Sequence, residues 1–171
     1  FIKRKDEFTI NIALIEDRQP VFGLVYAPAL DELAWAVRGQ GAWLVTGGVT
    51  TPLRARVTAD TPIITISRSH ADAATVAVLD AIGAHDTLAA GSALKFIRLA
   101  QGAADLYPRL GPTSEWDTAA GQCVLEAAGG RVVDFAGVPF HYNRGSSLLN
   151  PGFLAYGDAA MDWQRRLVGV L

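Results

Sequence analysis

Alternating apolar and polar positions dominate the first third of the chain. Between residues 8 and 15 the sequence Phe-Thr-Ile-Asn-Ile-Ala-Leu-Ile repeats apolar side chains with the period of a strand that buries one face. Residues 21–27 form a second, almost wholly apolar run, and residues 33–37 and 42–45 follow after short turn-forming segments. Because short connections join antiparallel strands, this pattern predicts a four-stranded meander.

A different rhythm begins near residue 61, where short strands alternate with helical segments. Strands are predicted at residues 63–67, around Thr87, and at residues 104–107, 131–135 and 153–156. Helices are predicted at residues 71–82, 92–101, 117–128 and 159–168. This alternation predicts a mostly parallel or mixed sheet covered by helices. The chain therefore divides into a meander at residues 1–60 and an α/β unit at residues 61–171.

Composition excludes several functional classes. The chain has 171 residues, 50% of them hydrophobic, which is enough for a substantial core. A net charge of −2 gives no overall positive field for nucleic acid, so a phosphate ligand needs local cations. No apolar run reaches membrane-spanning length. The single cysteine, Cys123, favours a reducing compartment. We expect a cytoplasmic protein, with a peripheral position on the cytoplasmic face of the inner membrane as the alternative.

A turn-rich segment at residues 111–116 runs directly into an apolar helix predicted to begin at Asp117. Gly111 and Pro112 interrupt the preceding element, and the small residues after Asp117 predict a helix that packs closely against a neighbour. Unpaired N–H groups and the helix dipole favour a carboxylate in the first turn, so the pattern alone indicates a helix cap.

The sequence Gly-Ser-Ala-Leu-Lys at residues 91–95 is a second candidate site. Gly91 permits close backbone approach, and Ser92 at a predicted helix start either caps the helix or offers its hydroxyl to an anion. Lys95 projects from the same helix face and adds a compact positive charge. From the pattern alone, the cap is the favoured role of Ser92.

Further polar residues could contact a ligand. Ser69 and His70 lie at a strand-to-helix turn, where a lone histidine is usually structural. Arg109 offers planar donors suited to phosphate or to stacking on a base, although a solvated side chain or a salt bridge to Glu115 fits the spacing equally well. Three other acidic residues are interpreted as surface or pairing charges: Asp105, Glu126 and Asp134.

These motifs resemble the inositol monophosphatase superfamily of metal-dependent, lithium-sensitive phosphatases. The sequence Trp-Asp-Thr-Ala-Ala-Gly at residues 116–121 is similar to the family signature Trp-Asp-x-x-Ala-Gly. Four other segments resemble the 3'(2'),5'-bisphosphate nucleotidase branch in order and spacing: residues 66–72, 91–96, 106–109 and 149–153. The resemblance covers nearly the whole chain and implies an α/β fold built as a layered α-β-α-β-α sandwich.

The resemblance implies removal of the 3'-phosphate from 3'-phosphoadenosine 5'-phosphate, giving AMP and phosphate, in sulfate assimilation. It makes Asp117 a metal ligand, a catalytic residue and a substrate contact, with two or three Mg²⁺ ions as cofactors. The residues that it assigns to nucleotide binding are Ser69, His70, Gly91, Ser92, Lys95 and Arg109. The alternatives are an inositol monophosphatase-like enzyme acting on sugar or inositol phosphates, and an inactive nucleotide-binding fragment.

The resemblance also implies a longer protein. Family members carry two helices, a glutamate pair and an Asp-Pro-x-Asp-Gly-Thr motif upstream of the matching region, and these supply most metal ligands. Phe1 resembles the phenylalanine that follows that motif. We therefore expect the chain alone to be inactive. We also expect the apolar face formed by alternate residues of 8–15 and 21–27 to be uncovered, or capped by the N-terminal part or by a second copy.

Overall fold

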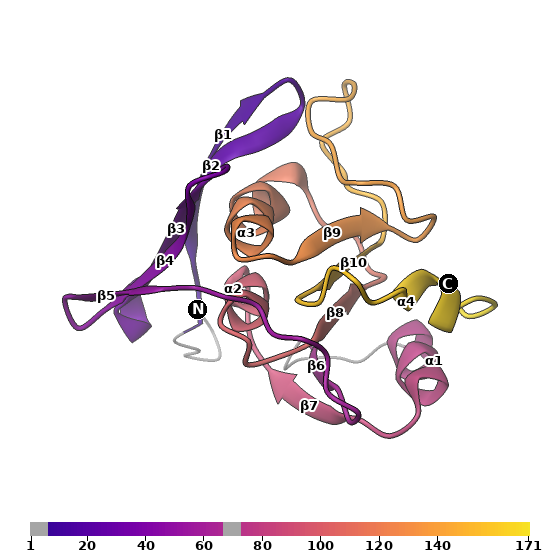
Figure 1. Cartoon of the computed structure of the whole chain (residues 1–171). Helices are drawn as coiled ribbons and strands as arrows, with labels where there is room; N and C mark the ends of the chain where they lie inside the picture. Colours follow the sequence, from indigo (N-terminus) through magenta and orange to yellow (C-terminus); the bar gives the residue numbers. More distant parts are fainter. Residues whose placement is uncertain (1–6, 67–72) are drawn as a thin grey trace.

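The computed structural model describes residues 7–66 and 73–171, and these residues form two five-stranded sheets with helices between and beside them (Figure 1). The strands of the first sheet, in both chain order and spatial order, are β1 (Ile10–Glu16), β2 (Gln19–Ala27), β3 (Glu32–Val37), β4 (Gly41–Thr46) and β5 (Val49–Pro52). A short 3-10 helix, Pro28–Leu30, connects β2 to β3. All neighbouring pairs are antiparallel, which confirms the predicted meander.

The meander has one strand more than the pattern predicts. Gly47 and Gly48 join β4 to β5 and have φ values of 57° and 77°, the conformation that a two-residue hairpin turn requires. Every residue of β5 is exposed, so the strand has no buried face and leaves no apolar alternation in the sequence. The pattern of the sequence therefore gives no sign of this fifth strand.

The second sheet has the order β7-β6-β8-β10-β9. Its strands are β6 (Ile63–Ile66), β7 (Asp86–Ala89), β8 (Leu106–Arg109), β9 (Arg131–Asp134) and β10 (Phe153–Tyr156). β6 is parallel to β7 and β8, whereas β10 is antiparallel to β8 and β9, so the predicted mixed sheet is confirmed. Both faces are buried, because Phe153 and Ala155 belong to one apolar cluster and Leu154 and Tyr156 to another.

Helices cover both sides of the second sheet. They are α1 (Ala73–Ile82), α2 (Leu94–Ala100), α3 (Glu115–Ala127) and α4 (Trp163–Arg166). In Figure 1, α2 and α3 lie between the two sheets, and α1 and α4 lie on the far side of the second sheet. The closing helix α4 is much shorter than the predicted helix at residues 159–168, since it starts only after its cap Asp162. No helix within residues 7–66 and 73–171 has the length and apolar character needed to cross a membrane.

Two glycines, which have no side chain, allow α3 to pack very closely against strand β2 and helix α2. A Cβ added to Gly23 of β2 would lie 2.5 Å from the carbonyl oxygen of Ala120 in α3. A Cβ added to Gly121 of α3 would lie 2.5 Å from Cδ2 of Phe96 in α2. The prediction of a closely packed helix is therefore confirmed, although α3 begins at Glu115, two residues earlier than predicted.

The substitution Gly121→Ala is expected to lower the free energy of unfolding by about 1–3 kcal/mol, because the new methyl group overlaps the Phe96 ring. At a helical position with free space around it, the same change would stabilise the protein by about 1 kcal/mol. A lower free energy of unfolding for Gly121→Ala would therefore be due to the overlap with Phe96. Urea unfolding measures the difference. Gly145→Ala is the matched control, since nothing lies within 4 Å of that Cβ position. Equal stability of Gly121→Ala and wild type would contradict the close contact.

A buried ion pair ties the segment between the sheets to the start of β8. The Asp105 carboxylate, which is fully buried, accepts hydrogen bonds from Nε of Arg56 at 2.8 Å and from its Nη2 at 2.6 Å. The same carboxylate accepts the backbone N–H of Ile63 at 2.7 Å. Asp105 is therefore the pairing charge that the sequence predicts.

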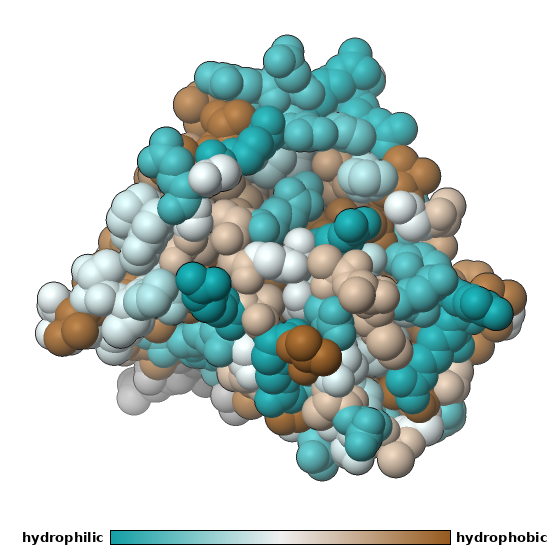
Figure 2. Space-filling view, viewed as in Figure 1, coloured by the Kyte–Doolittle hydropathy of each residue, from teal (hydrophilic) through white to brown (hydrophobic). Residues whose placement is uncertain are grey.

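The outer face of the first sheet is apolar, and no helix of the described residues covers it. Phe8, Ile10, Ile12 and Leu14 are each between 50% and 54% exposed. Trp35 and Trp43 stack on the same face with ring centroids 4.5 Å apart. In Figure 2 this face is turned edge-on at the left of the molecule, so only its rim is seen, with a few hydrophobic residues among paler ones. The uncovered face agrees with the expectation from the sequence, while the identity of its cover stays a prediction.

Candidate functional site

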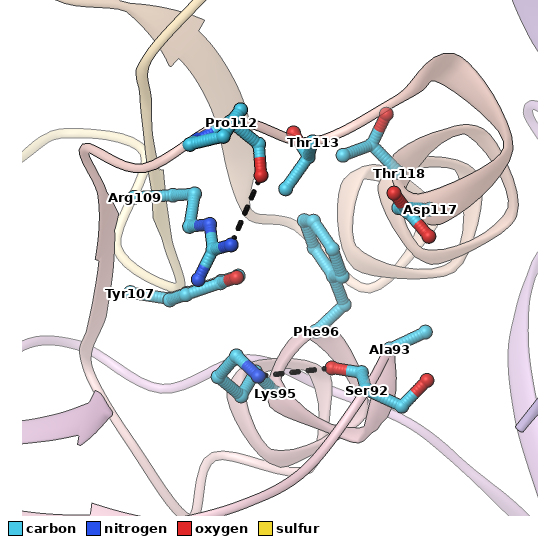
Figure 3. Close-up of a pocket in the computed structure, with 10 residues that line it drawn as sticks. All are labelled: Ser92, Ala93, Lys95, Phe96, Tyr107, Arg109, Pro112, Thr113, Asp117 and Thr118. Carbon is cyan, nitrogen blue, oxygen red and sulfur yellow. Dashed lines mark hydrogen bonds between the residues drawn. The ribbon is translucent and has the colours of Figure 1, made fainter. Parts of the chain in front are cut away.

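A polar pocket opens where the start of α2, the end of β8 and the start of α3 meet (Figure 3). Its volume is about 250 Å³. The residues that line it are Ser92, Ala93, Lys95, Phe96, Tyr107, Arg109, Pro112, Thr113, Asp117 and Thr118. Four of the predicted site residues, which are distant in the sequence, are therefore brought together. Ser69 and His70 lie outside the described residues.

Asp117 is at the third position of α3, and its side chain is exposed at the pocket. Its Oδ2 atom accepts the backbone N–H of Ser114 at 2.9 Å, so the carboxylate closes the first turn of the helix. The predicted capping role is confirmed, and it coexists with a position on the pocket wall (Figure 3). Residue 114 has an extended backbone, as a residue that precedes a helix normally does.

Lys95 brings a positive charge into the pocket although only 4% of its surface is exposed. Its Nζ atom donates hydrogen bonds to the carbonyls of Ala90 at 3.2 Å and Ser92 at 3.1 Å, and it lies 5.0 Å from the centre of the Tyr107 ring. Burial lowers the pKa of Lys95 to about 8, and the positive charge of Arg109 adds to this effect, while Glu7 opposes it. This ammonium group is held in place by neutral carbonyls and an aromatic face, which suits it to meet an anion.

Ser92 has a φ of 47°, a left-handed conformation that is uncommon outside glycine. The helix α2 starts at Leu94 with Ala93 at its cap position, and no side chain caps it. The predicted capping role of Ser92 is therefore wrong, because α2 begins two residues later and Ala93 occupies its cap position. Its hydroxyl lies 2.6 Å from that of Thr9, so the segment that leads into β1 contacts this pocket wall.

Gly91 provides close approach, as predicted, but the neighbour is protein. A Cβ at this position would lie 2.9 Å from Cβ of Glu7 and 3.0 Å from the Glu7 carbonyl oxygen. Gly91 is not among the residues that line the pocket. The residue therefore allows the chain before β1 to pass directly over the Gly91–Ser92 turn.

Arg109 donates from Nη2 to the carbonyl of Pro112 at 3.0 Å, and Figure 3 shows its guanidinium on the pocket wall. Its Nε is buried and has no hydrogen-bond partner among the described residues. The alternative salt bridge is not formed, since Glu115 instead accepts the backbone N–H of Asn143 at 2.9 Å. An arginine with an unsatisfied buried donor at a pocket is well placed to bind an oxyanion.

Sequence reasoning did not predict several lining residues as site residues. Thr113 and Thr118 flank Asp117 and give no motif signal of their own. Tyr107 is buried, and burial raises its pKa to about 12, so the phenol stays protonated. The remaining acidic candidates act elsewhere: Glu126 accepts from Gln122 at 2.9 Å, and Asp134 accepts the N–H groups of Ala136 at 2.9 Å and Val138 at 2.8 Å.

The described residues of the pocket provide part of a Mg²⁺ site. Among the described residues that line the pocket, Asp117 is the one with a carboxylate, and a carboxylate oxygen is a ligand that Mg²⁺ accepts. Within the described residues, no group of three or more His, Cys, Asp or Glu side chains could hold a metal ion. Asp117 therefore fits as one ligand of a Mg²⁺ site that needs further oxygen ligands.

Comparison with known proteins decides the family. The model of the inositol monophosphatase family matches residues 1–165. The chain belongs to the inositol monophosphatase family. A curated relative, "3'(2'),5'-bisphosphate nucleotidase CysQ" of Escherichia coli (strain K12), is 49% identical over 153 residues, covering 90% of this chain and 61% of that protein. The protein of the same name from Buchnera aphidicola (subsp. Acyrthosiphon pisum, strain APS) is 38% identical over 157 residues, covering 91% of this chain and 59% of that protein.

Solved structures of the family have the same fold. The CysQ structure from Bacteroides thetaiotaomicron, described as a bacterial member of the inositol monophosphatase family, superposes with a TM-score of 0.84 at 37% identity. It is matched over 92% of this chain and 65% of its own. An inositol monophosphatase from Zymomonas mobilis superposes with a TM-score of 0.78 at 26% identity, over 99% of this chain and 65% of that one. The chain thus spans about three fifths of the length of its family relatives.

Proposed function

We propose that the protein carrying this sequence is a Mg²⁺-dependent phosphatase that hydrolyses the 3'-phosphate of 3'-phosphoadenosine 5'-phosphate to AMP and phosphate. The observation that carries the proposal is the pocket itself, where Asp117 faces a space shared with Ser92, Lys95 and Arg109. Relatives named 3'(2'),5'-bisphosphate nucleotidase support the substrate class. Because the chain spans about 61% of such a relative, the activity is proposed for a protein that also carries the remaining length.

The cations of the pocket suit a substrate with two phosphates. Arg109 offers a planar fork of donors, and Lys95 offers a compact ammonium group on the same side of the pocket, with Tyr107 between them (Figure 3). We assign Lys95 and the Ser92 hydroxyl to the second phosphate or the ribose, and Arg109 to the nucleotide. His70 and Ser69 are assigned to the nucleotide by resemblance alone.

Asp117 is proposed to hold Mg²⁺ and to contact the phosphate that leaves. When bound, Mg²⁺ supplies charge neutralisation on phosphoryl oxygens and a more acidic water. Asp117 contributes a carboxylate whose orientation is fixed by the Ser114 N–H. The positive charges of Lys95 and Arg109 hold the anionic substrate beside it. We place this reaction in sulfate assimilation, in the cytoplasm.

Phosphate release from 3'-phosphoadenosine 5'-phosphate and from inositol 1-phosphate tests the proposal. The assay uses Mg²⁺ and a protein that carries this sequence with the remaining length of its relatives. We expect kcat/KM to be at least about 100-fold higher for the nucleotide, since a site built to bind a substrate group rejects an analogue that lacks it. Preference for the inositol ester would contradict the substrate assignment. Nucleotide binding without phosphate release would contradict the enzymatic function.

A further inference from the structure

Asn150 bonds to the segment that leads into α3 and to the first turn of that helix, which carries Asp117. Its Nδ2 atom lies 2.8 Å from the carbonyl oxygen of Ser114, 3.1 Å from Oγ1 of Thr113 and 3.1 Å from Oγ1 of Thr118. Its backbone N–H donates to the carbonyl of Thr113 at 2.8 Å. Asn150 itself does not line the pocket, but Thr113 and Thr118 do, one on each side of Asp117 in the sequence. One amide side chain therefore joins the chain before α3 to the first turn of α3.

The residues just before Asn150 bond to the same helix start, and we name residues 142–150 the strap. The carbonyl of Leu148 accepts the backbone N–H of Glu115 at 2.9 Å. Leu149 pairs with Ser114 as an isolated antiparallel bridge. At the other end of the strap, the Tyr142 hydroxyl lies 3.1 Å from Oγ1 of Thr118. The strap thus provides a partner for the Glu115 N–H, one of the first-turn groups that the regular hydrogen bonds of a helix leave unpaired.

The chemistry of the contacts requires a side chain with N–H donors. The Ser114 carbonyl can only accept a hydrogen bond, and the buried Thr118 hydroxyl already lies 3.3 Å from the Glu115 carbonyl, to which it donates. An amide supplies two N–H hydrogens, whereas a carboxylate of the same shape supplies none. Replacing Asn150 by Asp would therefore set a carboxylate oxygen against the Ser114 carbonyl oxygen without changing the volume of the side chain.

We propose that Asn150 is a positioning residue that fixes the entrance of α3, and with it the Asp117 carboxylate, relative to the cations of the pocket. Asn150 acts through Thr113, Ser114 and Thr118 and touches neither substrate nor metal. Its role in turnover rests on the proposed function, whereas its control of the helix entrance does not. Asn150 belongs to the motif at residues 149–153, so this proposal gives one residue of that motif a structural role at the site.

The test compares Asn150→Asp and Asn150→Ala with wild type in a protein that carries this sequence and the remaining length of its relatives. Ser146→Ala is the matched control, because its side chain is exposed on the same strap. We expect hydrogen exchange at the amide of Glu115 to become at least about tenfold faster in both Asn150 variants. We also expect the Mg²⁺ concentration for half-maximal phosphate release to rise about 10- to 100-fold, as it does when partners of metal ligands are lost.

The outcomes separate positioning from simple stabilisation. A lower melting temperature with an unchanged Mg²⁺ midpoint and unchanged exchange at Glu115, measured where the variant is folded, would overturn the proposal. If Asn150→Ala does not fold, the isosteric Asn150→Asp still decides the question through the same two readouts. If wild type releases no phosphate, the proposed function fails, and exchange at Glu115 together with calorimetric Mg²⁺ binding decides the positioning role alone.

Discussion

Replacing Asp117 with asparagine is expected to lower kcat by about 10³-fold in a protein that carries this sequence at full family length. The carboxylate is proposed to hold Mg²⁺, whose charge stabilisation is worth several kcal/mol, and each 1.36 kcal/mol corresponds to a factor of ten in rate. Asparagine keeps an oxygen that can accept the Ser114 N–H, so the helix cap is retained. Phosphate release at saturating 3'-phosphoadenosine 5'-phosphate measures the loss.

Stability is the first control for Asp117→Asn. Loss of the negative charge near the helix start costs only about 0.3–1 kcal/mol, so the variant should stay folded and its melting temperature should change little. Glu115→Gln is the matched variant, because Glu115 is in the same helical turn and does not line the pocket. We expect near wild-type turnover for Glu115→Gln. Similar losses in both variants, or full activity in Asp117→Asn, would contradict the role of Asp117.

Replacing Lys95 with methionine is expected to lower kcat/KM for the bisphosphate by about 10- to 100-fold, since a hydrogen bond to a charged group contributes about 1.5–3 kcal/mol. Methionine keeps an unbranched apolar stem that fills the buried space. Adenosine 3'-monophosphate, which lacks the second phosphate, is the control substrate, and its kcat/KM should change much less. Equal losses for the two substrates would exclude the second phosphate as the partner of Lys95 and favour the ribose, the alternative assignment.

The same lysine gives a pH dependence with a defined sign. Burial lowers the pKa of Lys95 to about 8, so the charged form is present below this pH and is lost as the pH rises through it. We expect kcat/KM for the bisphosphate, which reports the free enzyme, to decline above about pH 8. In Lys95→Met this decline should be absent. A wild-type profile without the decline would show that Lys95 does not carry the charge that binds substrate.

The sequence predicts those strands and helices in which the side chains on one face differ in polarity from those on the other. Alternation at residues 8–15 is visible because the small and polar residues of β1 face α3, whereas its larger apolar residues lie on the other side of the sheet. The strand β5 has no buried side, so no pattern marks it. The length of α4 is set by turns around Asp158 and Asp162, which polar composition alone does not distinguish from helix.

The residues of the candidate site that lie in recognisable sequence motifs could be predicted from the sequence. Asp117, Ser92, Lys95 and Arg109 converge on one pocket as the family resemblance implies. The backbone of Ser92 was not predictable, because its left-handed turn lies under Thr9 and Glu7, which are distant in the sequence.

Asn150 shows the same limit of sequence reasoning. The residue stands in a recognised motif, but its contacts with Thr113, Ser114 and Thr118 depend on how the strap folds back over α3. Such contacts between distant segments are fixed by tertiary packing. Local pattern therefore identifies the charged groups of the pocket but not the residues that hold them in place.

The most direct measurement is a crystal structure of the protein at full family length with Mg²⁺, AMP and phosphate. The account predicts an Asp117 carboxylate oxygen about 2.0–2.1 Å from a Mg²⁺ ion. It also predicts phosphate oxygens within hydrogen-bonding distance of Lys95 or Arg109. A structure with Mg²⁺ and nucleotide bound away from this pocket, and with Asp117 bonded only to the Ser114 N–H, would contradict it.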